Sequence, residues 1–120
     1  MDIRKCYEEL GGSYEEVSAR LPSLKLIERF IGKFLEDKSY YVLCEQMKCG
    51  NRKEAFLAAH TLKGVSANLG FTALESSASK LTEELRGEGE GITAVACELM
   101  IGVERDYSAT VRAIRNYLNQ

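Results

Sequence analysis

The segment that decides the fold covers residues 55–70 and reads AFLAAHTLKGVSANLG. On a helical wheel with about 100° per residue, most of its apolar side chains fall within a stripe of roughly 80°. That stripe consists of Ala55, Ala58, Leu62, Val65 and Leu69. The spacing of three and four residues is typical of a helix and not of a strand, where apolar side chains alternate. The segment therefore predicts a helix that packs on one face.

The rest of the chain shows the same spacing between clear helix ends. The single proline, Pro22, and the glycine-rich run 87–91 interrupt the helical pattern. Ser13–Glu16 and Asn51–Glu54 each have the form of a capping box, and Gly50 is suited to ending the helix before Asn51. These signals predict helices over residues 2–10, 13–21, 23–36, 39–49, 52–69, 72–86 and 92–118.

No stretch alternates apolar and polar residues for long enough to predict a strand. The expected fold is all-α: an antiparallel up-down four-helix bundle with additional short N-terminal helices. A chain of 120 residues can bury roughly two-thirds of its unfolded surface, which is enough for one core. We therefore expect a single helical bundle domain over residues 1–120.

Charge and hydropathy exclude two classes of partner. Sixteen basic and eighteen acidic residues give a net charge of −2, whereas nonspecific nucleic-acid binding usually rests on a basic excess. The longest nearly apolar run, 92–103, is shorter than the about 20 residues of a membrane span and contains Glu98. No apolar signal-peptide stretch follows the first residues. We expect a cytoplasmic monomer that binds neither nucleic acid nor membrane.

The four cysteines do not form a metal-binding pattern. Cys44 and Cys49 are five positions apart, which fits neither a zinc knuckle nor a redox Cys-x-x-Cys pair. His60 is the one histidine of the chain. We therefore expect free thiols, no metal site and no cofactor.

His60 lies about 180° from the middle of the apolar stripe, which disfavours a core histidine and leaves a surface or a functional histidine open. Phe56, Lys63, Gly64 and Ala67 share its outer face. Lys63 can place its ammonium group beside the imidazole. Gly64 costs about 1 kcal/mol relative to alanine in a helix interior. Its missing Cβ would let a partner or a phosphoryl group approach the histidine.

Residues 60–64 and 69–70 together resemble the H-x-L-K-G-x-x-x-x-L-G signature of histidine-containing phosphotransfer (HPt) domains. Six fixed positions would coincide by chance on the order of once in 100,000 chains of this length. Residues 34–37, the break at 50–51 and the leucines of the following helix are also similar to that family. The short N-terminal helices and the last helix match in shape alone.

The resemblance implies a phosphorelay intermediate. His60 would accept a phosphoryl group from the aspartyl phosphate of a response-regulator receiver domain and pass it to another receiver aspartate. A neutral imidazole is a good nucleophile near neutral pH. Lys63 would stabilise the phosphoryl charge, and the receiver would bring the Mg²⁺. The protein would be a carrier without catalytic turnover, and a hybrid histidine kinase is a further expected partner.

The resemblance also suggests residues around the histidine. Members of the family often have a polar or basic side chain on the next helix, where Thr82 and Arg86 stand here; Thr82 replaces the glutamine of some members. The alternative for both is a solvated helix face. Phe56 and Ala67 would line an apolar docking surface around Gly64, unless a neighbouring helix or the N-terminal segment buries Phe56.

Two other functions stay open from the sequence. The chain could be the phospho-accepting domain of a larger histidine kinase, although it has no room for an ATP-binding domain. It could also be a helical adaptor that binds receiver domains without being phosphorylated. The intact set of His60, Lys63 and Gly64 disfavours the adaptor, which has no use for that combination.

Overall fold

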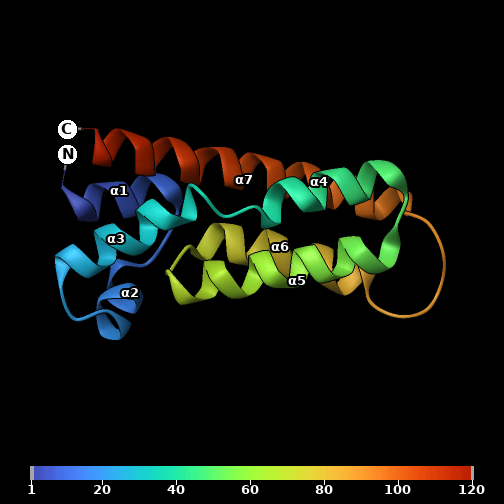
Figure 1. Ribbon diagram of the computed structural model, residues 1–120, viewed down its shortest axis with the longest axis horizontal. Coiled ribbons are helices and arrows are strands. Elements are labelled where there is room, and N and C mark those ends of the chain that lie inside the picture. The colour runs from blue at the N-terminus through green and yellow to red at the C-terminus, as the bar shows by residue number, and fades with distance from the viewer. Residues whose placement is uncertain (1, 120) are drawn as a thin grey trace.

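The computed structural model describes residues 2–119, and this part of the chain is helical without strands, as predicted (Figure 1). The helices are α1 (Ile3–Leu10), α2 (Tyr14–Arg20), α3 (Leu24–Phe34), α4 (Ser39–Cys49), α5 (Arg52–Asn68), α6 (Thr72–Leu85) and α7 (Ala94–Leu118). No helix within residues 2–119 combines the length and the apolar composition needed to cross a bilayer.

Helices α4 to α7 form the predicted antiparallel bundle. α5 packs between α4 and α6, and α6 packs against α7 (Figure 1). The fourth side closes through aromatic rings: Tyr40 of α4 stacks on Tyr107 of α7 with ring centres 3.8 Å apart and planes 6° from parallel. The C-terminal half of α7 extends past the bundle, where α1 and α3 pack against it (Figure 1).

Side-chain caps mark the beginnings of α1, α2, α3, α5 and α7, whereas α4 and α6 begin without one. Ser13 accepts a hydrogen bond from the Glu16 N–H at 3.2 Å, as the capping box predicts. Its own N–H donates to the Gly70 carbonyl at 2.8 Å instead of to the Glu16 carboxylate, so only half of the box forms. The last helix begins at Ala94 and not at residue 92, because Thr93 caps it.

The turn between α5 and α6 explains the second half of the signature. Gly70 has a φ of +71°, and a Cβ at this position would lie 2.7 Å from the Ser13 carbonyl oxygen. The Tyr7 hydroxyl of α1 donates to the Leu69 carbonyl at 2.7 Å. Leu69 and Gly70 therefore hold the N-terminal helices against the end of α5.

Candidate functional site

The structure buries one face of α5 and exposes His60 on the other, as the wheel predicts. The buried residues of the helix are Ala55, Ala58, Ala59, Leu62 and Ser66. Val65 is only half-buried, although the wheel places it in the stripe. Because α5 packs against both α4 and α6, its buried face is wider than the stripe and turned slightly toward Ala59 and Ser66.

The imidazole of His60 lies in open surroundings. Gly64, one turn further along α5, is exposed, and a Cβ built there would have no heavy atom within 4 Å. Lys63 is half-buried and shares this side of the helix. One turn before the histidine, the Phe56 ring lies 5.9 Å from the His60 ring, centre to centre. Phe56, Lys63 and Gly64 therefore lie around the imidazole, and the side at Gly64 is open.

Helix α6 contributes a charged pair to the same site. The Arg86 guanidinium lies over the Phe56 ring, 5.1 Å from its centre. It donates two hydrogen bonds to the Glu83 carboxylate, from Nε at 3.0 Å and from Nη2 at 3.2 Å. These bonds and the charge of Arg86 lower the pKa of Glu83, and the nearby Lys63 adds to that effect. Arg86 thus lies over Phe56, whose ring is next to that of His60.

Sequence reasoning missed Glu83. Its signal was present as a glutamate three positions before an arginine, a spacing that places both side chains on one helix face. The resemblance pointed to Arg86 on this face, but only the packing of α6 on α5 shows that Glu83 lies there too.

Thr82 was expected beside His60, and this prediction is wrong. The side chain is buried, and its hydroxyl donates to the Ala78 carbonyl of its own helix at 2.7 Å. That bond uses the hydroxyl's single proton, so Thr82 has none to donate to a phosphoryl group on His60. Thr82 instead satisfies its hydroxyl within its own helix.

Arg52 fixes the relative position of α5 and α6, a role that the sequence did not indicate. From the first turn of α5 its guanidinium donates to the carbonyls of Glu84, Leu85 and Arg86, at 3.0, 3.2 and 3.4 Å. These are carbonyls at the end of α6, which lack partners within the helix. Arg52 therefore fixes the position of Arg86 along the axis of α5, next to Phe56.

The model of one protein family, the Hpt domain, matches residues 23–120, which include α3 to α7 and the histidine site. The chain belongs to the Hpt domain family. Members of this family act in histidine phosphotransfer in two-component phosphorelays, where they interact with receiver domains. The resemblance seen in the motif is confirmed. No curated protein and no solved structure matches the chain significantly.

The expected docking residues of this Hpt domain differ in their surroundings. Phe56 is half-buried, because it packs against the core and the Arg86 guanidinium lies over its ring. Ala67 is also half-buried, and its carbonyl accepts a hydrogen bond of 2.6 Å from Arg20 of α2. The surface at Gly64, between them, is open.

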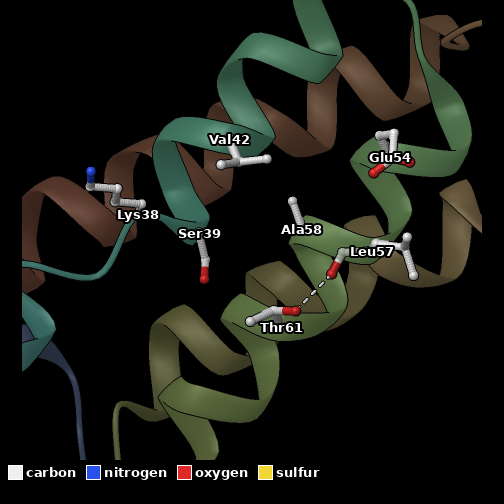
Figure 2. Close-up of a pocket in the computed structure, with 7 residues that line it drawn as sticks. All are labelled: Lys38, Ser39, Val42, Glu54, Leu57, Ala58 and Thr61. Carbon is white, nitrogen blue, oxygen red and sulfur yellow. Dashed lines mark hydrogen bonds between the residues drawn. The ribbon is translucent and has the colours of Figure 1, made fainter.

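An apolar groove lies on the other flank of the Hpt histidine, between α4 and α5 (Figure 2). It has a volume of about 360 Å³. Its lining residues are Lys38, Ser39, Val42, Glu54, Leu57, Ala58 and Thr61. Val42 and Leu57, on facing helices, are 45% and 49% exposed at this groove. His60 thus has apolar surface on both sides.

The cysteines of the Hpt domain are free, as predicted. Cys6 is buried, Cys44 is half-buried, and Cys49 and Cys97 are exposed. Within residues 2–119, no three His, Cys, Asp or Glu side chains are placed to hold a metal ion together.

Proposed function

We propose that His60 is the phosphoacceptor of a phosphorelay intermediate. It would accept a phosphoryl group from a receiver aspartyl phosphate and pass it to the aspartate of another receiver. The observation that carries this proposal is the exposed imidazole on the outer face of α5, with open space at Gly64 and Lys63 on the same side of the helix.

In the proposed reaction, the unprotonated ring nitrogen of His60 attacks the phosphorus atom. The bond between phosphorus and the aspartyl oxygen breaks, and the departing carboxylate takes the electron pair. Transfer to the next receiver is the same step in reverse, with a new carboxylate as the nucleophile. Such a step requires in-line placement and charge neutralisation more than a general base. Lys63 supplies a cation, and the receiver brings the Mg²⁺.

In this proposal the protein is a carrier and not an enzyme, because the phosphoryl group leaves only when a partner aspartate arrives. It acts as a cytoplasmic monomer between receiver domains, one of which can belong to a hybrid histidine kinase. The absence of large side chains at Gly64 supports a partner that comes close to the imidazole.

The proposed docking surface consists of Phe56, Gly64 and Ala67, together with the groove between α4 and α5. Ala67→Glu should weaken receiver binding by roughly tenfold, since it adds a negative charge that an acidic receiver pocket repels. Val95→Glu on α7 is the matched control, because Val95 is 52% exposed and lies on a helix that packs mainly against α6 and α1. Equal affinity of the Ala67→Glu and wild-type proteins would show that receivers dock elsewhere.

Incubation with a phosphorylated receiver tests the central proposal. The label should appear on His60 alone through an acid-labile bond, and His60→Gln should abolish it. Persistent labelling of His60→Gln would show that another residue accepts the group. Receiver binding without any labelling of the wild-type protein would identify an adaptor instead.

A further inference from the structure

The Glu83–Arg86 pair stands beside the phosphoacceptor site and has no part in the transfer step described above. Its two hydrogen bonds, at 3.0 and 3.2 Å, join the guanidinium to both carboxylate oxygens. The same guanidinium lies over the Phe56 ring, and the Phe56 ring lies 5.9 Å from the His60 ring, centre to centre. One aromatic ring therefore separates the pair from the imidazole.

Both members of the pair are exposed, with side-chain exposures of 51% for Arg86 and 59% for Glu83. An exposed ion pair contributes little to stability, because water and salt compete for both charges. A stronger anion that arrives nearby can therefore take the arginine at small cost.

A phosphoryl group on His60 would be such an anion. At neutral pH a protein-bound phosphoryl group carries between one and two negative charges and offers several acceptor oxygens. The planar guanidinium binds phosphoryl and carboxylate oxygens in the same two-bonded geometry. Glu83 and the phosphoryl group thus compete for the same donors, and their charges repel each other.

We propose that Glu83 is a positioning residue that withholds Arg86 from the phosphoryl group on His60. In the unphosphorylated protein the guanidinium is bound to Glu83. In the phosphorylated protein it is shared with the phosphoryl oxygens, at the expense of its bonds to Glu83. Glu83 thereby weakens the hold of the site on the phosphoryl group and favours its onward transfer. This inference rests on His60 as the phosphoacceptor and involves no covalent step of its own.

The test uses phosphoramidate, a small phosphoryl donor that reacts with an exposed imidazole whether or not a receiver recognises the protein. The full chain is phosphorylated, and the pKa of the phosphoryl group is read from a ³¹P NMR titration. Glu83→Gln should lower that pKa by roughly 0.3–0.7 unit, because the freed Arg86 stabilises the dianion. Glu98→Gln on α7 removes the same charge far from the site and should leave it unchanged.

A second pair of variants separates the role of Arg86 from a simple charge effect. In an Arg86→Gln background, Glu83→Gln should lose most of its effect on the phosphoryl pKa. The Arg86 Nε–H resonance of the wild-type protein should also move when His60 is phosphorylated. Both substitutions are at exposed sites, and circular dichroism will verify that the helices remain.

An unchanged phosphoryl pKa in Glu83→Gln would overturn the proposal. So would an effect that persists at full size without Arg86, because Glu83 would then act by repulsion alone. Failure of the relay gives a different result: the phosphoramidate data would follow the expected pattern, yet no receiver would label His60.

Discussion

At the scale of single residues, Gly64 is expected to lower the stability of α5 while it leaves room for a receiver at His60. It lies inside α5 without a positive φ, so alanine fits the backbone there and should stabilise the helix by about 1 kcal/mol. The added methyl group meets no atom of the protein itself. It would instead occupy the space through which a receiver approaches His60. Gly64→Ala should therefore raise the urea midpoint and slow phosphotransfer.

Gly32→Ala provides the control for this prediction. Gly32 also lies within a helix without a positive φ, and its added Cβ would make an ordinary contact, 3.7 Å from Leu118. This variant should gain stability and keep the wild-type transfer rate. If Gly64→Ala also transfers at the wild-type rate, the space beside the imidazole is not used by the partner.

Lys63 is a second single residue whose role can be tested, because we expect it to act through its charge alone. Lys63→Ala should slow phosphotransfer by roughly fivefold, the effect of losing about 1 kcal/mol of charge stabilisation. The side chain lies outside the buried face of α5, so the free energy of unfolding should change by no more than about 0.5 kcal/mol. Lys53→Ala, at an exposed site on the same helix, is the control for rate. A large drop in melting temperature would reveal that Lys63 contributes to packing.

At the scale of helices, the α5–α6 pair forms the site, and Arg52 holds the two together at one end. Arg52→Gln removes a charged donor from three carbonyls at the end of α6. Hydrogen bonds to charged groups are among the stronger ones, so the variant should lose about 1–2 kcal/mol of unfolding free energy. Urea denaturation measures this loss, and Lys53→Gln serves as the control. Unchanged stability would mean that water replaces the guanidinium at these carbonyls.

For the whole molecule, the attachment of α1 to the bundle predicts how stability depends on pH. The Cys6 thiol of α1 is buried and donates to the Ala113 carbonyl of α7 at 3.5 Å. Burial, with a smaller effect from Glu9, raises the pKa of Cys6 from 9.0 to about 11. The folded protein thus keeps the proton more tightly than the unfolded chain does. The resulting stability is complete below pH 9 and is lost as the pH rises toward 11.

Under reducing conditions, the free energy of unfolding should therefore fall between pH 9 and about 11 by about 1–2 kcal/mol more in the wild-type protein than in Cys6→Ala. Cys97→Ala, which removes an exposed thiol, should keep the wild-type slope. Equal slopes in all three proteins would show that Cys6 ionises as freely in the folded state as in the unfolded one. Tyr117, whose pKa burial and a hydrogen bond to Glu28 raise to about 12, contributes to the loss at higher pH.

The sequence by itself determined the helices, their caps and the exposure of His60. Each of these depends on residues within one or two turns of each other. A capping side chain accepts a hydrogen bond from the backbone N–H three residues later, and the spacing of apolar residues defines the buried face of a helix. The same local logic predicted the open space at Gly64. It also identified the family motif, whose fixed positions all lie within residues 60–70.

Only the tertiary structure decided which groups face the histidine from α6. The relative rotation and height of two packed helices depend on their whole buried faces and on contacts such as those of Arg52 with the end of α6. The family resemblance therefore suggested Thr82 and Arg86, whereas packing buries Thr82 and places Glu83, bound to Arg86, near the site. Sequence spacing predicts which residues share a face of one helix. Which residues of another helix lie against that face is decided only when the core packs.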